Sequence, residues 1–574
     1  MQAASYDLLL QQAASACPGF FAGFGELAEH EGSVAISTPS RGFRQLLIEG
    51  LVARRTTPLV VLCGSSDAAE ELGTLVRTIP ELAAVAPSCV VLPELGVEFM
   101  EYTQFSRPLS FARARVLDRI YAEPDAVVFT TIQGLLDPAL PPGEFVDLVS
   151  VLNVGDRMVP QTFGHRLLRM GYEGVSAVTE MGQFSMRGNV FDLYSQVADY
   201  PARIVLEGNV ISRIKLFDPV SQQSVEPVSS IRVLPPYPVL LDQDARRTLA
   251  SAAIQRWREE HGNTVSQRDL EGSLAEDLES FVSTANGKGV NFFLYQYMDP
   301  GRVCGQVASL LASRAIMVLD DIDPSAELAM MMDSARELYD RTLQAGVVPS
   351  SQALDAVEKA ARQALGRFSK TVAVSGASIP DAIQADSRDL PPLTLSGSLA
   401  DYLALHAPQD TPIDLVSLNP GRAGQLVADA IDDPGTLERV ATMKGSLPAG
   451  FAVDGLVVLT DAELFPKTAA SPKKTARFSQ AISRLEDLHE GDYVVHRDLG
   501  IGVFRGITAM TVDGVTRDYI SLEYKDHSLL HVPVERLGYL EKYVGDRTEI
   551  ALDEPGSRRW KRRRKEAAED ARRI

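Results

Sequence analysis

The chain has 574 residues, which is too long for one hydrophobic core, so we expect three to five domains. Its composition, 45% hydrophobic and 23% charged, is that of a folded protein, and no apolar run approaches the ~18 residues of a membrane span. The first residues lack the basic start of a secretory signal, so we expect a cytoplasmic protein without membrane contact. The net charge of −20 confines any contact with nucleic acid to local basic patches. The four cysteines form no CxxC pair, which predicts neither a disulfide framework nor a metal site.

The N-terminal region alternates apolar runs with helical stretches. Residues 58–64 and 126–131 are apolar on both faces, as in buried parallel strands, and residues 42–53 and 66–78 have helical spacing. Strands separated by helices predict an α/β layer. Between 164 and 235 the apolar runs become short and are broken by Gly, Asn, Pro and Asp, which predicts a β-rich insert.

The α/β pattern returns after this insert. Residues 243–282 are expected to be helical, and residues 315–319 form another buried strand. Helical spacing follows at 352–365 and a strand at 455–460. Residues 465–478 are polar and contain Pro and Lys without periodicity, which is typical of a linker.

The C-terminal region contains a compact β unit followed by a basic segment. Strands are predicted at 493–496, 503–507, 519–524 and 529–534, in the pattern of a small SH3- or Tudor-like barrel. Residues 557–574 contain nine Lys or Arg against three acidic residues. This segment is either a solvated helix face or a segment that lies on a partner or on DNA.

Two regions resemble known families. Residues 491–504, 518–524 and 530–537 resemble the RNA-polymerase-interacting domain of transcription-repair coupling factors, a domain type shared with CarD-like regulators, which implies binding to the polymerase β subunit. Residues 182–194 and 214–224 resemble domain 2 of UvrB and its counterpart in coupling factors, which implies binding to UvrA. Both resemblances in this order are typical of the N-terminal, non-motor part of the bacterial transcription-repair coupling factor family.

The resemblance implies an α/β multidomain fold, in which a degenerate RecA-like UvrB-homology module with a β-rich insert precedes a small SH3/Tudor-like β-barrel of the CarD-like type. The implied boundaries are 1–133 for domain 1a with a degenerate P-loop, 134–225 for the UvrA-binding domain 2, 226–345 for domain 1b, 346–462 for a small α/β domain 3, 463–484 for a linker, 485–548 for the RNA polymerase-interacting domain and 549–574 for a basic helix. That helix would lead toward a DNA-translocase motor that is absent from this chain.

A nucleotide site would require a phosphate loop before the helix that starts near residue 42. Counting the motif G-x-x-x-x-G-K-S/T onto this loop puts Thr38 and Phe43 at the two glycines, Arg44 at the lysine and Gln45 at the magnesium ligand. Phe43 would block the approach of the backbone, so we predict a degenerate site and no enzymatic activity. ATP and Mg are expected only for the absent motor.

An acidic pair, Asp320 and Asp321, follows the buried strand at 315–319. The pair is either a Walker-B-like site or a helix-capping or turn pair.

Arg187 and Phe191 are the residues expected to contact UvrA. The resemblance places an Arg at Arg187 against acidic UvrA residues, and the neighbouring aromatic would supply a buried anchor. The alternative is that Arg187 caps a turn and Phe191 belongs to the core. Related domains often carry further Arg residues at the positions of Gly174 and Ser185, and Arg166 and Arg169, just upstream, are the residues that could compensate for their absence.

Polymerase contact is expected along one strand of the barrel. Alternation places Ile520 and Leu522 on one face and Tyr519 on the other, and an exposed edge strand could extend a partner sheet. The alternative is an internal strand whose two faces fill the barrel. The full set of expected contact residues is Tyr519, Ile520, Leu522, Leu530, Val532 and Arg536.

These features predict a recruitment platform in transcription-coupled nucleotide-excision repair. The expected partners are the RNA polymerase β subunit, UvrA, and double-stranded DNA through the absent motor, with the basic C-terminal helix as a second candidate for DNA contact. The alternatives are a stand-alone CarD-like transcription regulator and an active UvrB-type excision-repair subunit.

Overall fold

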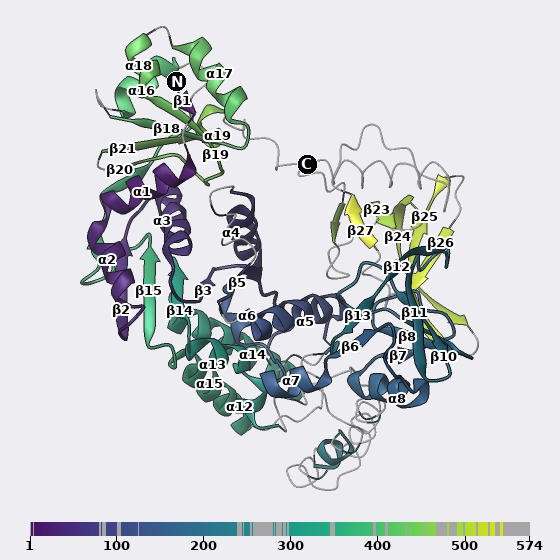
Figure 1. Cartoon of the computed structure of the whole chain (residues 1–574). Helices are drawn as coiled ribbons and strands as arrows, with labels where there is room; N and C mark the ends of the chain where they lie inside the picture. Colours follow the sequence, from purple (N-terminus) through teal and green to yellow (C-terminus); the bar gives the residue numbers. More distant parts are fainter. Residues whose placement is uncertain are drawn as a thin grey trace. The chain divides into compact units, whose positions relative to one another are not determined.

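The structure, a computed structural model, comprises two compact units, Met1–Pro466 and Lys467–Ile574 (Figure 1). The first unit is described except at 1, 4, 80–81, 83–87, 100, 102–104, 124, 238–243, 245, most of 253–297, 345–350, 394–397, 408–410, 432, 454 and 466. In the second unit the described residues are 479–481, 491–496, 500–512, 515–525, 529–533 and 540–543. None of the helices within these ranges is long and apolar enough to cross a membrane.

A seven-stranded parallel sheet forms the centre of the first unit, in the order β16-β2-β15-β14-β3-β5-β4. Its strands are β2 (Gly32–Ser37), β3 (Leu59–Leu62), β4 (Cys89–Val91), β5 (Val127–Thr130), β14 (Ile316–Asp320), β15 (Lys370–Ser375) and β16 (Ile383–Gln384). The apolar runs correctly predict β3, β5 and β14. In β3, Leu59 and Val61 pack into one hydrophobic cluster and Val60 and Leu62 into another, so both faces of the sheet are covered.

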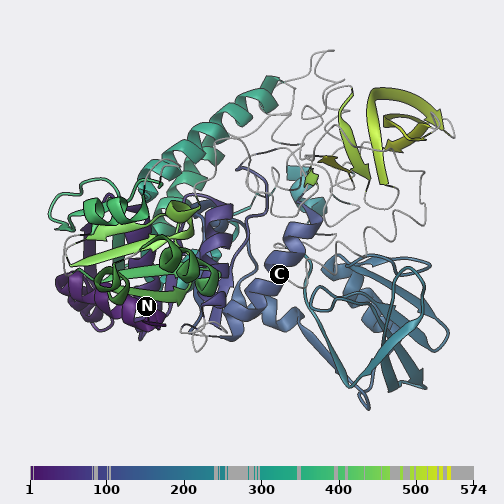
Figure 2. The same ribbon diagram turned by 90° about the horizontal axis from the view of Figure 1, so that it is seen from above.

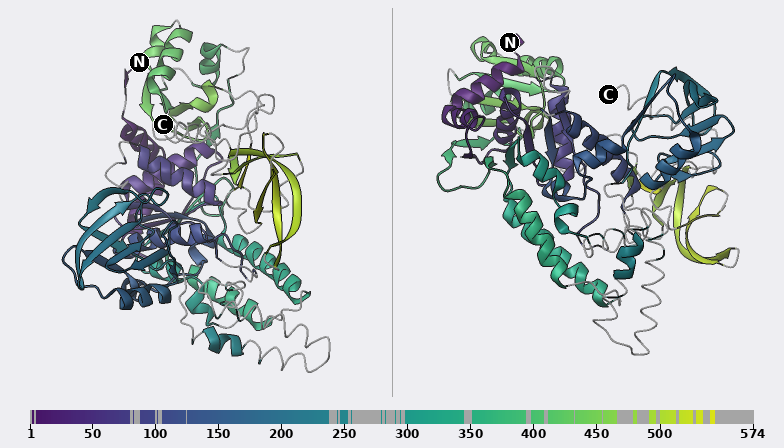
Figure 3. Two further views of the ribbon diagram at one scale, coloured as in Figure 1. Left: turned by 90° about the vertical axis from the view of Figure 1, so that its right-hand side faces the viewer. Right: turned by 60° about the horizontal axis from the view of Figure 1, so that its bottom comes forward.

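Helices cover the two faces of this sheet. They are α2 (Pro18–Glu26), α3 (Arg41–Arg54), α4 (Ser66–Thr78), α5 (Arg107–Ala122), α6 (Ile132–Leu136), α7 (Pro142–Leu148), α12 (Pro300–Val303), α13 (Gln306–Ala312), α14 (Pro324–Gln344) and α15 (Ser351–Leu365). Ser65 and Thr131 each cap the helix that follows them with a side-chain oxygen, as strand-to-helix turns require. The helices α14 and α15, drawn in teal in Figure 3, both contribute apolar side chains to one hydrophobic cluster.

A smaller sheet has the order β1-β19-β18-β21-β20-β17. Its elements are β1 (Gln2–Ala3), β17 (Ser387–Asp389), β18 (Ile413–Ser417), β19 (Val440–Lys444), β20 (Phe451–Val453), β21 (Leu456–Thr460), α1 (Tyr6–Ala16), α16 (Leu399–His406), α17 (Pro420–Ala430), α18 (Pro434–Glu438) and α19 (Asp461–Leu464). The N-terminal helix α1 packs on one face of this sheet in a cluster shared with α3 (Figure 2). The predicted domain boundary at 346 does not coincide with the division between the two sheets. Strand β15, which follows residue 346, pairs with β14 in the larger sheet, and the N-terminal strand β1 pairs with β19 in the smaller sheet.

The β-rich insert is a six-stranded sheet in the order β12-β11-β10-β9-β8-β7. Its strands are β7 (Glu173–Gly174), β8 (Gln183–Arg187), β9 (Val190–Leu193), β10 (Ala202–Glu207), β11 (Val210–Phe217) and β12 (Ser224–Val228). The helix α8 (Pro160–Met170) packs on one face, and β6 (Ser150–Asn153) pairs with β13 (Ser230–Val233) where the chain enters and leaves. Arg232 anchors this region to α5 through Asp118, at 2.6 Å.

The second unit is an antiparallel sheet in the order β22-β27-β23-β24-β25-β26. Its strands are β22 (Ser479–Ala481), β23 (Tyr493–His496), β24 (Gly500–Val512), β25 (Val515–Glu523), β26 (Leu529–Pro533) and β27 (Leu540–Tyr543). The strand β22 falls within the predicted linker 463–484 and pairs with β27, which extends the sheet beyond the expected start at 485. The described elements make a mixed α/β protein with one large parallel sheet and several further sheets. This confirms the predicted α/β fold class.

Candidate partner-binding sites and the phosphate-loop position

The turn between β2 and α3 occupies the position of a phosphate loop. Only Thr38, Pro39 and Ser40 separate the two elements, whereas a phosphate loop wraps several backbone N–H groups around its ligand. The hydroxyl of Ser40 accepts a hydrogen bond from the N–H of Phe43 at 3.1 Å and donates one to Oδ1 of Asp389 at 2.7 Å. A carboxylate of the chain therefore lies at the positive end of α3, where a phosphate would otherwise be attracted.

Two of the residues aligned with the phosphate-loop motif, Thr38 and Phe43, are buried in the protein. Thr38 is fully buried and shares a hydrogen bond with the hydroxyl of Ser387. The sequence predicts that Phe43 blocks the approach of the backbone to a phosphate, whereas in the structure its ring is buried, 5.2 Å from that of Phe451. The reason is that α3 begins at Arg41 and turns position 43 toward the smaller sheet.

The other two residues aligned with this motif, Arg44 and Gln45, bind side chains of the protein itself. The guanidinium of Arg44 forms an ion pair with Asp321 at 3.1 Å. Asp321 has a φ of 55° and accepts a hydrogen bond from the N–H of Gly376 at 2.7 Å. These contacts favour a turn role for this acidic residue over a Walker-B-like site. Burial raises the pKa of the neighbouring Asp320 to about 6. Gln45 donates a hydrogen bond to a carboxylate on its own helix at 2.9 Å.

A pocket of about 430 Å³ opens beside this turn. It is lined by Ser37, Thr38, Pro39, Gly376, Ser378, Gln384, Ala385 and Asp386. The lining contains a carboxylate and no Lys or Arg, and the guanidinium of the neighbouring Arg44 already donates to the carbonyls of Thr38 and Pro39 at 3.4 Å and is paired with Asp321. Among the residues that the structure describes, no group of three His, Cys, Asp or Glu could hold a metal ion.

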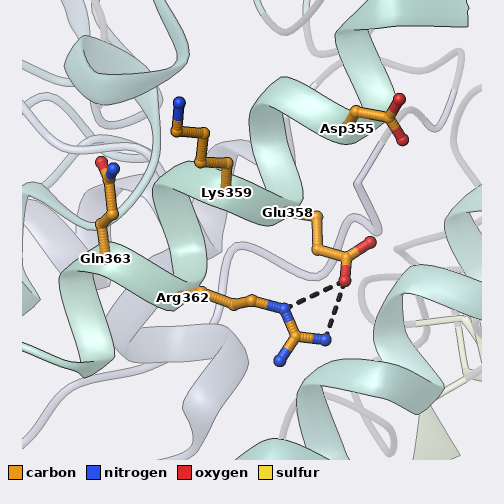
Figure 4. A pocket seen from close by; sticks show the side chains of 5 residues that line it. All are labelled: Asp355, Glu358, Lys359, Arg362 and Gln363. Atoms are coloured by element: carbon orange, nitrogen blue, oxygen red, sulfur yellow. Dashed lines mark hydrogen bonds and ion pairs between the residues drawn. The ribbon is translucent and has the colours of Figure 1, made fainter.

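A second hollow, of about 440 Å³, lies along α15 (Figure 4). Among the charged residues that line it, Glu358 accepts a hydrogen bond from Arg362 at 2.8 Å, and it accepts a second one, also at 2.8 Å, from Arg336 of α14. This network links the two helices, and it leaves Glu358 with two cationic partners.

The strands β8 and β9 form a two-residue hairpin that presents Arg187. The register pairs Arg187 with Val190 across the turn Gly188-Asn189. Gly188 has a φ of 61°, a left-handed conformation that favours glycine and suits the twist of such a hairpin. The side chain of Arg187 is 59% exposed, which is the accessibility that a partner contact requires.

A buried ion pair lies directly beneath Arg187. The side chain of Asp192 is 2% exposed, and Nε and Nη2 of Arg203 both donate to it at 2.8 Å. These hydrogen bonds raise the pKa of Arg203, whose guanidinium also lies 4.3 Å from the ring centre of Phe217. Nη2 of Arg187 lies 3.5 Å from the same carboxylate. The three charged groups leave one net positive charge, which Arg187 exposes.

Phe191 cannot be the exposed anchor that the sequence predicts, and this expectation is corrected. The residue is fully buried, with its ring 5.6 Å from those of Phe184 and Phe163. Across the hairpin it pairs with Met186, so it lies on the face opposite to Arg187. The structure supports the alternative that Phe191 belongs to the core.

Arg166 and Arg169 lie on α8, which covers this opposite face. Arg166 donates hydrogen bonds to the carbonyls of Asp147 and Leu148 at 2.7 and 3.2 Å and thereby caps α7. Arg169 is exposed near the end of α8. The fold therefore does not bring these two residues to the face that carries Arg187.

In the second unit, β25 is an inner strand and not an edge. It pairs with β24 on one side and with β26 on the other, and Ile520 and Leu522 are fully buried. Their expected contact with polymerase is therefore corrected, because both side chains belong to the core of this sheet. For Tyr519, Leu530 and Val532 only the strand pairing is described, and Arg536 lies outside the described residues.

Among the described strands, β22 and β26 end the sheet. Leu529, the first residue of β26, is 58% exposed, which is unusual for a large apolar side chain on a strand. An apolar residue beside an edge is what strand addition by a partner requires. The sequence predicts an exposed edge at β25, whereas the edge strand on this side of the described sheet is β26.

Two family models match the chain. The UvrB interaction domain matches residues 151–237, and the CarD-like/TRCF RID domain matches residues 488–544. The first match contains the sheet with Arg187, and the second contains β23 to β27. The fold and these matches define a protein that combines the two domains on one chain.

The chain is also similar over most of its length to curated transcription-repair-coupling factors. It is 26% identical to the Myxococcus xanthus protein over 494 residues (76% of this chain, 39% of the relative). The Mycobacterium bovis protein is 26% identical over 579 residues (92% and 46%), and that of Bacillus subtilis is 24% identical over 453 residues (72% and 37%). The resemblance to the N-terminal part of this family is confirmed, and the chain spans less than half the length of these relatives.

Proposed function

We propose that the chain is a recruitment platform in transcription-coupled nucleotide-excision repair. It binds the β subunit of a stalled RNA polymerase through its CarD-like domain and recruits UvrA through its UvrB interaction domain. The observation that carries the proposal is the presence of both domains, in this order, on one chain. In this proposal the second unit is the SH3/Tudor-like barrel, and the parallel sheet is a degenerate RecA-like module that takes no nucleotide.

The UvrA site of this proposal is centred on Arg187. Its exposure and its position above Asp192 and Arg203 favour a directional contact with a partner carboxylate. Arg187→Ala is expected to weaken UvrA binding by about 2–5 kcal/mol if the contact becomes buried. The fold should persist, because an exposed ion pair contributes at most about 1 kcal/mol. Calorimetric titration of the full chain with UvrA measures the change, and unchanged affinity would refute the site.

The polymerase site of this proposal is the edge strand β26. Leu529→Arg should leave the circular dichroism spectrum intact and reduce capture of RNA polymerase, because Leu529 is exposed beside the edge. Leu522→Arg is the matched comparison: a charge placed at a fully buried position should unfold the sheet. Undiminished capture by a folded Leu529→Arg chain would exclude β26 as the edge used.

UvrA binding separates this function from its alternatives. A chain that captures polymerase but not UvrA would be a CarD-like regulator, and a chain that binds Mg-ATP would resemble an active UvrB-type subunit. Contact with DNA is assigned in this proposal to other parts of the whole protein and to the basic segment 549–574, which lies outside the described residues.

A further inference from the structure

We propose that the face carrying Arg187 extends across β9 and β10 to Arg213 on β11. It forms one docking surface for a partner segment that has two carboxylates about 14 Å apart with apolar side chains between them. This inference rests on the proposed function, because it assigns the segment to UvrA. It adds a second arginine, three strands away from Arg187, to the contact.

The register of four strands carries the argument. Across β8, β9, β10 and β11, one row is Arg187, Val190, Val205 and Arg213. Directly opposed residues of an antiparallel sheet share a face, so these four side chains stand side by side. Val190 and Val205 are half-buried and Arg213 is exposed. The row is therefore a short apolar strip with an arginine at each end.

The neighbouring row supplies charge of the same sign. It runs through Ser185, Asp192, Arg203 and Lys215. Because Asp192 is buried and bound by Arg203, its negative charge is shielded from the surface. The exposed charge of the two rows is positive, in a chain whose net charge is −20. This local positive charge favours an acidic partner segment.

The spacing defines the kind of segment that fits. Neighbouring strands lie about 4.8 Å apart, so Arg187 and Arg213, three strands apart, are about 14 Å from each other. Two carboxylates four residues apart on an extended segment point to the same side and span about the same distance. The side chains between them would cover Val190 and Val205. A single acidic residue could engage only one end of this surface.

The test compares charge reversals in the full chain, with purified UvrA of the same organism as the probe. Arg213→Glu is expected to weaken binding about ten-fold or more at low salt, with a smaller loss at high salt. Arg213→Gln should give a smaller loss in the same direction. The comparison variant is Arg169→Glu, which makes the same charge change on the helix that covers the opposite face, and it should stay within about two-fold of wild type.

Each outcome decides a separate point. If Arg187→Glu weakens binding and Arg213→Glu does not, the surface ends at the hairpin and this inference is wrong, although the proposed function stands. If Arg169→Glu is as damaging as Arg213→Glu, the effect is one of net charge and the docking face is rejected. If the wild-type chain does not bind UvrA at all, the proposed function itself falls. Circular dichroism of each variant is the folding control. Because Arg213 is exposed, its replacement should leave the spectrum unchanged.

Discussion

Arg203 and Arg187 share the carboxylate of Asp192 but differ in what their removal leaves behind. Arg203→Ala would leave a carboxylate that is 2% exposed with only the 3.5 Å contact to Arg187. Loss of one partner of a buried pair costs about 3 kcal/mol, whereas Arg187→Ala should cost less than about 1 kcal/mol. Hydrogen exchange of β8 to β11 in the two variants measures this difference. Equal protection in both would show that Asp192 does not depend on Arg203.

Glu49 of α3 is fully buried, and Tyr6 and Gln45 donate hydrogen bonds to it at 2.6 and 2.9 Å. Burial raises its pKa from 4.5 to about 7, against the smaller opposing effect of these hydrogen bonds. The folded state therefore holds a proton that the unfolded state has lost, and the stabilisation present below pH 4.5 disappears as the pH rises through 7.

The variant Glu49→Gln should remove this pH dependence. We expect it to resemble wild type in urea unfolding at pH 5 and to be more stable than wild type at pH 8, by on the order of 2 kcal/mol. Other titrating groups cancel when the two proteins are compared at the same pH. A difference that does not change between pH 5 and pH 8 would mean that the carboxylate stays charged in the fold.

At this scale the sequence around the hairpin is enough to separate Arg187 from Phe191. Gly188-Asn189 is a two-residue turn, and such a turn fixes the register of the strands beside it. Counting outward from the turn puts Arg187 opposite Val190 and Met186 opposite Phe191, which separates Arg187 from Phe191. The role of Asp389 at the start of α3 could not be predicted, because it approaches Ser40 only after the smaller sheet has formed.

At the scale of elements, the start of α3 differs from that of a helix that follows a phosphate loop. Its preceding turn is short, Ser40 and Asp389 occupy its first turn, and Arg44 is paired with Asp321. We predict no micromolar binding of Mg-ATP in calorimetric titration. Asp389→Ala should not restore binding, because the turn still cannot surround a triphosphate. A micromolar dissociation constant for either protein would overturn the assignment of a degenerate site.

The strands β3, β5 and β14 were predictable because they are buried on both faces and therefore appear as continuous apolar runs. Strand partners were not predictable in the same way. The short strand β1 joins β19, although more than 400 residues separate them, and β15 joins β14 after two intervening helices. Neither pairing leaves a local pattern, so the division between the two sheets had to come from the structure.

At the scale of the whole molecule, the two proposed partner surfaces belong to different compact units. The sheet with Arg187 and Arg213 lies in the first unit, and β26 lies in the second. Each surface has its own residues, its own core and its own kind of recognition: paired arginines for one and a strand edge for the other. Variants should therefore affect one partner at a time.

A bridging experiment tests this separation directly. Immobilised RNA polymerase should retain UvrA only when the full chain is present, because in the proposed function the chain makes both contacts. The variant Arg213→Glu should remain on polymerase and lose UvrA, since Arg213 is exposed on a sheet of the first unit. The variant Leu529→Arg should lose polymerase and still bind UvrA in solution, since Leu529 lies on the edge strand of the second unit. If either change abolishes both interactions in a chain that remains folded, the two surfaces are coupled and the chain is not a simple platform.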